Sequence, residues 1–293
     1  MTRLVRRLFC FIALMVLTSS LTLIEAKDKD ETTAPLKVMS FNIRNAKAKD
    51  GTNSWQYRFP GTALMIKDEM PDILAMQEPL YPQVQFILDN FSDYKMIGKG
   101  REDGKKEGEF TAIFYNKKKI SCIKSGVFWL SENSKKPSKG WDAFCKRTAT
   151  WAIMSHKDTK ERFFVLNTHL DHVGSKARQY GLALVLKKIK QINKDNYPVI
   201  LTGDFNVQPG NKCLKQIDSS MHNARKEALK TDNHCSFHEW GRKHEVIDYI
   251  YYSGIDTCLE FRTVTKKYGD WNFISDHYPI VALFDLADCS KEQ

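Results

Sequence analysis

The chain has 293 residues and a formal net charge of +10, and hydrophobic residues make up 42% of it. There is no Pro/Gly/Ser-rich linker, internal repeat or low-complexity tract after the first segment, which argues against a second domain and against a repeat architecture. The excess of basic residues favours binding to polyanions. Much of this excess lies in lysine-rich turns such as residues 117–119, so the net charge identifies no partner by itself.

Residues 1–26 have the pattern of a secretory signal peptide. Three arginines precede an apolar run over residues 8–17, and small and hydroxylated residues follow. The charged residues 27–35 predict a flexible tether, and residues 36–293 predict one folded domain. We therefore expect a secreted or periplasmic protein. The alternative is a membrane anchor over residues 8–24, although the apolar run is shorter than the roughly 20 residues that a spanning helix needs.

The first part of the domain predicts strands with two helices between them. Apolar runs and helical spacing give, in chain order, a strand over 36–43, a helix over 58–69 ended by Pro71, a buried strand over 72–76 that leads to Glu78, and a surface helix over 81–91. From 94 to 170 the pattern is mostly strands separated by polar turns, with strands at 110–116, 119–126, 148–156 and 162–170.

A long helix opens the second part of the domain. Ser175 is the expected N-cap, and apolar residues recur at helical spacing up to Ile189, which predicts a helix that covers a sheet face. The continuous apolar run of the next strand, at 198–205, predicts a strand buried on both faces. Two short helical stretches after Pro209 precede strands at 246–253, 258–264 and 278–286.

Short polar clusters follow several of these strands. They are SFNIR with Asn42, MQEP with Glu78, NTHLDH with His169, TGDFN with Asp204 and Asn206, IDYI with Asp248, and SDHYPI with Asp276 and His277. Rigid strands hold the residues at their ends, and chemistry in α/β proteins gathers at one sheet edge. Carboxylates and amides suit a hard cation such as Mg²⁺, and a histidine beside an aspartate supplies a polarised imidazole. The clusters therefore predict one hydrolytic metal site.

Together these clusters resemble the endonuclease/exonuclease/phosphatase superfamily, most specifically in GDFN followed by SDH before the last strand. The resemblance covers residues 36–286, and the segments GREDGKKEGE and NTHLDH look most like an exported bacterial branch near the nocturnin-like deadenylases. It implies an α/β fold, a four-layer αββα sandwich of two packed mixed β-sheets flanked by helices. It also implies divalent-metal phosphoester hydrolysis in a cleft at one end of the sheets.

Three of the clustered residues are expected at the metal. Glu78 and Asp276 would supply carboxylate oxygens, and Asn42 would assist the metal or the phosphate. The expected cofactor is Mg²⁺, for which Mn²⁺ can substitute.

The other clustered residues are expected to act on the reacting groups. Asp204 would deprotonate the attacking water, and Asn206 would hold that water or a phosphate oxygen. Asp248 would fix the tautomer of His277 and favour its protonated state, so that the ring donates to the transition state. His169 resembles the histidine that family members use on the opposite side of the phosphate.

Arginines next to these segments can bind phosphate bidentately, and Arg58, Arg147 and Arg178 are expected in this role, although each could equally be ion-paired scaffold. His238, in SFHEW, is expected to line the pocket wall. Glu109, in GEFTAIFY, is expected near the metal cleft, where it would tether an arginine.

The expected activity is hydrolysis of a phosphate ester such as RNA, DNA or a nucleotide, by a monomer without a stable protein partner. The alternatives are a sphingomyelinase-like or inositol-phosphate phosphatase activity, and a catalytically silent binding module. A lipid substrate would need an exposed apolar loop, for which residues 127–130 (VFWL) are the candidate unless they form a buried strand. The six cysteines outside the leader permit disulfides, but the sequence does not select a pairing.

Overall fold

The computed structural model describes residues 35–286, which belong to one compact unit. The predicted signal peptide and residues 27–34 of the predicted tether lie outside the described residues. Among the described helices, none has the length and apolar character needed to cross a membrane. Each of the five cysteines in this part of the chain is a free thiol.

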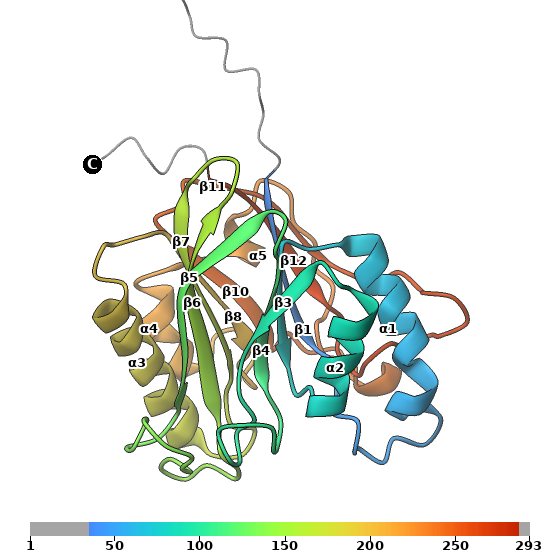
Figure 1. The fold of residues 1–293 in the computed structure, drawn as a ribbon. Coiled ribbons are helices and arrows are strands. Elements are labelled where there is room, and N and C mark those ends of the chain that lie inside the picture. Colours follow the sequence, from blue (N-terminus) through green and yellow to red (C-terminus); the bar gives the residue numbers. More distant parts are fainter. Residues whose placement is uncertain (1–34, 287–293) are drawn as a thin grey trace, which may run out of the picture. The chain divides into compact units, whose positions relative to one another are not determined.

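Two six-stranded mixed sheets form the centre of the fold (Figure 1). The first sheet has the strand order β11 (Thr257–Thr263), β12 (Ile280–Asp285), β1 (Leu36–Asn42), β2 (Ile73–Gln77), β4 (Thr111–Asn116) and β3 (Tyr94–Ile97). The second has the order β5 (Ile120–Trp129), β6 (Thr148–His156), β7 (Arg162–His169), β8 (Val199–Asp204), β10 (Asp248–Ser253) and β9 (His222–Asn223).

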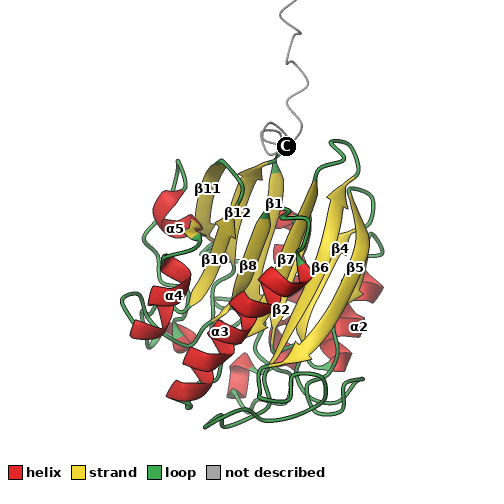
Figure 2. Ribbon diagram, turned by 90° about the vertical axis from the view of Figure 1, so that its left-hand side faces the viewer, coloured by secondary structure: helices red, strands yellow, loops and turns green. Residues whose placement is uncertain are grey.

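Helices cover the outer face of each sheet (Figure 2). One apolar cluster joins the first sheet to α1 (Trp55–Glu69) and α2 (Tyr81–Asn90), and another joins the second sheet to α3 (Ser175–Ile192) and α4 (Lys215–Asp218). The remaining short elements are α5 (Ala224–Glu227) and the 3₁₀ turns η1 (Gly51–Asn53), η2 (Lys212–Leu214) and η3 (Glu239–Gly241). The predicted four-layer αββα sandwich is confirmed.

Successive apolar side chains along each strand point to alternate faces of the sheet, which explains the layers. In β1, Val38 packs between the sheets, while Met39 and Phe41 pack against the helices. In β7, Val165 faces the other sheet and Leu166 faces α3. Because successive side chains of a strand point to opposite faces, a continuous apolar run is what a strand buried on both faces requires.

Two local predictions are corrected by the structure. Gly174 is the N-cap of α3, and Ser175 is the first residue of the helix. The Asp142 carboxylate, from another loop, accepts hydrogen bonds from the backbone amides of Lys176 and Ala177, the latter at 2.7 Å. The helix α1 begins at Trp55, three residues before the predicted start.

The VFWL segment is mostly buried, as a strand should be, so it offers no exposed apolar loop for a lipid surface.

Candidate active site

Strand register brings the polar strand ends together. In the first sheet the register of the parallel pair β1 and β2 places Asn42 beside Gln77, so both strands end at the same edge. In the second sheet both His169 and Asp248 lie beside Asp204, through the β7–β8 and β10–β8 pairs. The Asn42 amide donates to Asp204 with an Nδ2–Oδ2 distance of 3.0 Å. The ends of both sheets therefore meet at this carboxylate, at the end of the molecule where β1 finishes (Figure 1).

Asp204 lies at the centre of the cluster and is 1% exposed. Its Oδ1 accepts a hydrogen bond from the backbone of Asn206 at 2.9 Å, and its Oδ2 lies 3.4 Å from Nε2 of His169 and 3.8 Å from Nε2 of His277. Burial and the neighbouring Asp248 raise the pKa of Asp204 to about 7. A carboxylate with a pKa near neutrality can take a proton from water and release it again.

Asp248 and His277 form a buried pair in which Oδ2 and Nδ1 are 2.8 Å apart. Burial by itself would lower the pKa of His277, but the charge and hydrogen bond of Asp248, together with the charges of Asp276 and Asp204, outweigh it and raise the pKa to about 10. Ligand atoms of Asp204, Asp248 and His277 lie within 4.8 Å of one another, a spacing compatible with a metal ion. A protonated ring whose Nδ1 is bonded to Asp248 is a poor ligand, so we interpret this group as a hydrogen-bonded dyad beside a base.

Glu78 and Asp276 are suited to a hard divalent cation. Glu78 accepts hydrogen bonds from the Asn42 side chain at 3.0 Å and from the Asn45 backbone at 3.1 Å, and although burial opposes it, these bonds hold its pKa below the usual value. Burial and the charge of Glu78 raise the pKa of Asp276, which lies 3.6 Å from a guanidinium nitrogen of Arg44. Two close carboxylates that repel each other would be stabilised by a bound dication.

Asn42 has a different position from the one expected of a simple metal ligand. Its Nδ2 donates to both Glu78 and Asp204, and its Oδ1 accepts from the backbone of Arg44 at 3.0 Å. One lone pair of the amide oxygen remains for a cation, so the residue fits the site mainly by fixing the two carboxylates.

Backbone strain marks the loops that carry these groups. Arg44, Glu78 and Asn206 have φ values of 59°, 68° and 53°, in the left-handed region. Non-glycine residues rarely adopt this conformation, and it persists where the surrounding structure determines it strongly. Each of the three follows a strand end, so the strain turns the side chains toward the cleft.

His169 is neutral in this arrangement. Burial and the charges of Arg147 and Arg101 hold its pKa well below the usual value. Its Nε2 lies 3.0 Å from Nδ2 of Asn206, which also donates to the Leu170 carbonyl at 3.0 Å. An amide nitrogen only donates, so this Nε2 accepts and the ring proton is on Nδ1. His169 can therefore support Asn206 by hydrogen bonding but brings no positive charge to a phosphate.

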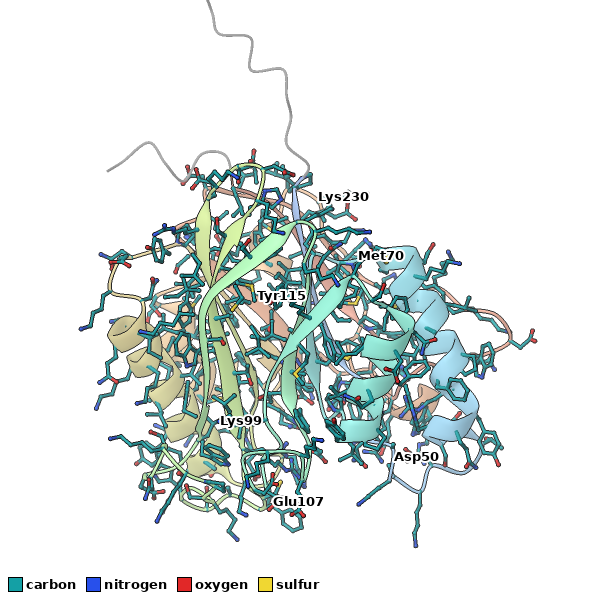
Figure 3. The ribbon with its side chains drawn as sticks, in the orientation of Figure 1. Asp50, Met70, Lys99, Glu107, Tyr115 and Lys230 are labelled. Carbon is teal, nitrogen blue, oxygen red and sulfur yellow. The ribbon has the colours of Figure 1, made fainter. Side chains whose placement is uncertain are left out.

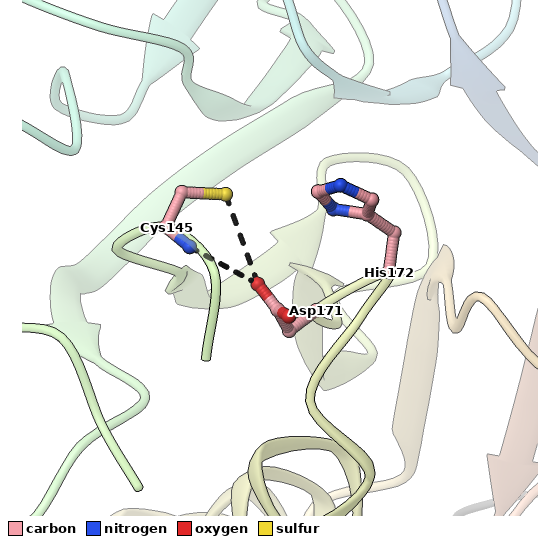
Figure 4. Close-up of side chains that lie close together, drawn as sticks. All are labelled: Cys145, Asp171 and His172. Carbon is pink, nitrogen blue, oxygen red and sulfur yellow. Dashed lines mark hydrogen bonds between the residues drawn. The ribbon is translucent and has the colours of Figure 1, made fainter. Parts of the chain in front are cut away.

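Arg147 is the predicted phosphate-binding arginine that lines the cleft with a free donor. It is 5% exposed, and its Nη1 has no hydrogen-bond partner within residues 35–286. Its Nε lies 3.4 Å from Asp171, and its Nη2 lies 2.9 Å from Nδ1 of His172. Figure 4 shows Asp171 between Cys145, which donates to it through its backbone amide, and His172. The orphaned Nη1 is suited to an anionic ligand.

The structure places Arg58 away from the reacting groups. Its guanidinium donates to the carbonyls of Ile43, Ile274 and Arg44 at 2.7 to 2.8 Å, and burial lowers its pKa to about 10. This is the arrangement of a scaffold residue that bonds the carbonyls of three loops, and Arg58 is not among the residues that line the cleft.

Two further predicted residues also lie outside the lining of the cleft. Arg178 donates to the Asp171 carbonyl at 2.8 Å and is not among the residues that line the cleft. His238 is 2% exposed and lies against the rings of Phe273 and Tyr278, at 4.5 and 4.1 Å between centroids, so it supports the wall from behind. Burial lowers its pKa to about 4.

The cleft has a volume of about 620 Å³ and contains residues that the sequence patterns did not indicate. Arg44 pairs with Asp50, whose position at the lower end of the molecule is marked in Figure 3, and Arg101 pairs with Glu109, the expected arginine tether. Burial and Glu78 raise the pKa of Glu109 to about 7. Phe237, in the SFHEW segment expected at the pocket wall, also lines the cleft. The additional lining residues are Arg44, Asn45, Asp50, Arg101, Phe144, Cys145, His172, Glu239, Trp240, Arg242, Lys243, Glu245 and Ile247.

A four-layer αββα sandwich with these strand-end residues is the architecture of metal-dependent phosphoester hydrolases. Residues 39–277 match the model of the Endonuclease/Exonuclease/phosphatase family, and the chain belongs to this family. Members of the family act as metal-dependent phosphoester hydrolases on nucleic acids or other phosphate esters.

Solved structures of bacterial proteins resemble the chain over nearly their whole length. An endonuclease/exonuclease/phosphatase from Bacteroides vulgatus is 36% identical, with a TM-score of 0.81 over 86% of this chain and 99% of that chain. A mannosyl-6-phosphatase from Bacteroides thetaiotaomicron is 32% identical, with a TM-score of 0.81 over 85% of this chain and 99% of that chain. The human Nocturnin catalytic domain, 20% identical with a TM-score of 0.66 over 86% of this chain and 93% of that chain, shares the fold.

A curated relative is the 3'-5'-exoribonuclease subunit Ccr4 of the Candida albicans CCR4-Not complex, which is 25% identical. The match covers 81% of this chain and 38% of the relative, so the chain spans less than half of that protein's length.

Proposed function

We propose that the protein is a Mg²⁺-dependent phosphoester hydrolase that acts on a small phosphate ester with a hydroxyl-rich leaving group, such as a sugar phosphate. The observation that carries the chemistry is the position of Asp204, which lies 3.4 and 3.8 Å from two histidines at the junction of both sheets. The mannosyl-6-phosphatase relative, at 32% identity, supports the substrate class.

The charges in the cleft favour a small substrate over a long nucleic acid. Five lysine and arginine side chains line the cleft together with seven carboxylates. Arg44 pairs with Asp50, Arg101 with Glu109, and Arg242 with Glu239 at 3.6 Å. Nucleic-acid sites present unpaired lysines and arginines to successive phosphates. Here Arg147 offers a buried free donor, which is enough for one phosphoryl group.

The residues of the site divide the reaction between them. Asp204 accepts a proton from the attacking water, whose oxygen forms the new bond to phosphorus as the bond to the leaving oxygen breaks. The leaving oxygen takes a proton from solvent and departs as the free alcohol, and Asp204 then returns its proton to solvent. His277, held protonated by Asp248, donates to a phosphoryl oxygen whose negative charge grows in the transition state. Arg147 holds a second phosphoryl oxygen. A divalent cation held by Glu78 and Asp276, with Asn42 assisting, would neutralise phosphoryl charge and orient the ester.

Hydrolysis of a panel of substrates tests the proposal. Phosphate release follows the monoesters, and release of nucleotides or of phosphocholine follows the diesters. The panel comprises mannose 6-phosphate, ethyl phosphate, AMP, inositol phosphates, sphingomyelin, single-stranded DNA and RNA, each with Mg²⁺, with Mn²⁺ and with chelator. We expect metal-dependent turnover that is fastest with the sugar phosphate. Asp204→Asn should reduce kcat by roughly 10²-fold or more, as the loss of a general base does. Asp218→Asn is the matched control, since Asp218 bonds Tyr251 at 2.8 Å outside the cleft.

Absence of turnover on every substrate would refute the proposed activity, and unchanged kcat in Asp204→Asn would remove this residue from its role. The second candidate function is exoribonuclease activity, which the Ccr4 relative and the net charge of +10 favour. Release of nucleotides from RNA at a higher kcat/KM than phosphate from mannose 6-phosphate would select it.

We also propose that the protein is exported and monomeric. Export rests on residues 1–26, with their three arginines before an apolar run. The N-terminal residue of the mature protein, determined by mass spectrometry of the exported fraction, should follow Ala26. Retention of the leader on membrane-bound protein would support the anchor over residues 8–24 instead. Light scattering should give the mass of one chain.

A further inference from the structure

Residues 236–245 form a loop that begins and ends beside the catalytic dyad. The backbones of Phe237 and Glu245 exchange two hydrogen bonds, at 2.9 and 3.0 Å. Residues paired in this way carry their side chains on the same face. The ring of Phe237 lies 4.7 Å from that of His277, centroid to centroid, and both Phe237 and Glu245 line the cleft. The loop is therefore placed next to the reacting groups.

The middle of this loop has a strained backbone. Glu239, Trp240 and Gly241 follow one another with φ values of 43°, 60° and 87°. The strain is held by hydrogen bonds: the Asp276 carbonyl accepts from the backbones of His238 and Glu239 at 3.0 and 3.1 Å, and Nδ1 of His238 accepts from Gly241 at 3.3 Å. Successive left-handed residues are kept where the surroundings fix them, often at ligand sites. Here they fix Trp240 in the lining of the cleft.

Two polar groups of the loop have no partner within residues 35–286. The indole nitrogen of Trp240 makes no hydrogen bond there, and the carboxylate of Glu245 makes neither a hydrogen bond nor an ion pair, although both side chains are partly buried. Phe237 adds a second aromatic ring to the same part of the cleft. Part of the Trp240 ring packs on the Arg58 guanidinium, 5.8 Å from the ring centroid, and on the ring of Phe273 at 6.5 Å. The rest of the ring, its free N–H donor and the free Glu245 carboxylate line the cleft, where they are presented together to a ligand.

We propose that Trp240 and Glu245 form the leaving-group subsite and that it binds a sugar ring, an inference that rests on the proposed phosphoester hydrolase activity. The apolar C–H face of a pyranose packs on the indole, and ring hydroxyls donate to the Glu245 carboxylate. A nucleic acid would bring a further phosphate toward this wall, where the carboxylate of Glu245, which has no cationic partner within residues 35–286, repels it. The subsite therefore selects a neutral polyhydroxyl ring.

Steady-state kinetics of Trp240→Ala test the subsite. With mannose 6-phosphate we expect KM to rise roughly 5- to 20-fold and kcat to stay within about twofold, since stacking acts on binding and not on the bond that breaks. With ethyl phosphate, which has no ring, KM should not change. Trp240→Phe should restore most of the affinity. Trp141→Ala is the matched control, because Trp141 also has a positive φ, of 51°, and lies outside the cleft lining.

Glu245→Gln should raise KM for mannose 6-phosphate by roughly 5- to 10-fold, with ethyl phosphate again unaffected, because a neutral amide accepts sugar hydroxyls less strongly than a carboxylate. Binding can be followed without turnover in Asp204→Asn, where mannose 6-phosphate should quench tryptophan fluorescence. The quench should be lost when Trp240→Phe is added.

The outcomes separate the two proposals. If the wild-type protein hydrolyses no substrate of the panel, the proposed function fails. If it hydrolyses mannose 6-phosphate and Trp240→Ala leaves KM unchanged, the subsite alone is overturned. If Trp240→Ala raises KM for AMP more than for mannose 6-phosphate, the ring on Trp240 is a nucleobase and the sugar assignment is wrong.

Discussion

Replacement of Asp248 by Asn tests how the dyad sets the charge of His277. The carboxylate lies 2.8 Å from Nδ1 of His277 and is the main cause that raises the pKa of that ring to about 10, against the usual 6.5. Because burial alone lowers the pKa, Asp248→Asn should leave His277 neutral at pH 7. At about 1.4 kcal/mol per pKa unit the full shift corresponds to roughly 5 kcal/mol, and removal of one partner of a buried ion pair costs about 3–5 kcal/mol, so we expect a loss of folding stability in that range.

The sign of the pH dependence follows from the raised pKa. A histidine with a higher pKa in the folded than in the unfolded protein stabilises the fold fully below about pH 6.5, and this contribution is lost as the pH rises toward about 10. The difference in unfolding free energy between wild type and Asp248→Asn should therefore be largest near pH 6 and shrink at alkaline pH. Urea unfolding at several pH values measures it.

Two further measurements complete the test. Nitrogen NMR of the metal-free protein at pH 7 should show an imidazolium at His277 in the wild type and a neutral ring in Asp248→Asn. The kcat should fall by roughly 10² to 10³, the usual effect of losing a donor to transition-state charge. Asp218→Asn should change neither result. A His277 that remains protonated in Asp248→Asn, with kcat within fivefold of the wild type, would refute the reasoning.

The remaining predictions concern the metal, the phosphate and the sheet interface. Glu78→Gln should weaken Mg²⁺ binding by roughly 10- to 100-fold in calorimetry, and an unchanged affinity would place the cation elsewhere. Arg147→Lys should raise the KM for phosphate esters roughly tenfold, because one ammonium group cannot keep the contacts to Asp171 and His172 and also bind the phosphate as Nη1 does. Asn167→Leu should lower the unfolding free energy by about 2–4 kcal/mol in urea, since it leaves three buried partners unbonded, and a loss below 1 kcal/mol would contradict this.

The strand ends were predictable because the apolar runs before them are unambiguous. Glu78 follows a fully buried five-residue strand, and Asp204 ends a fully buried six-residue strand. Runs of this kind fix where a strand stops, and parallel neighbours in one sheet bring their carboxyl ends to the same edge. The sequence patterns could not supply the contact between Asn42 and Asp204, because it depends on how two separate sheets are placed against each other.

The sequence could not separate a phosphate-binding arginine from an arginine whose partner is a backbone carbonyl. Arg58 is next to a family-like segment, but its guanidinium meets carbonyls of residues more than two hundred positions apart in sequence, Ile43 and Ile274. No residue type signals a free carbonyl, so a scaffold arginine and a phosphate-binding arginine look alike in sequence. Trp240 could not be predicted to line the cleft because its position depends on the backbone. Gly241 indicates one left-handed residue, whereas the structure has three in succession.

Polar contacts between the sheets are concentrated near the active site. Across most of the interface the sheets pack through apolar side chains, which tolerate small sliding movements. At the site end, Asn167 of β7 donates to the carbonyls of Met76 and Ala112 at 2.8 and 3.0 Å and accepts from Gln77 at 2.7 Å. Hydrogen bonds are directional, so they fix the relative position of the sheets to which Asn42 and Asp204 belong. A variant that weakens them should therefore lose kcat at temperatures where the fold is still intact.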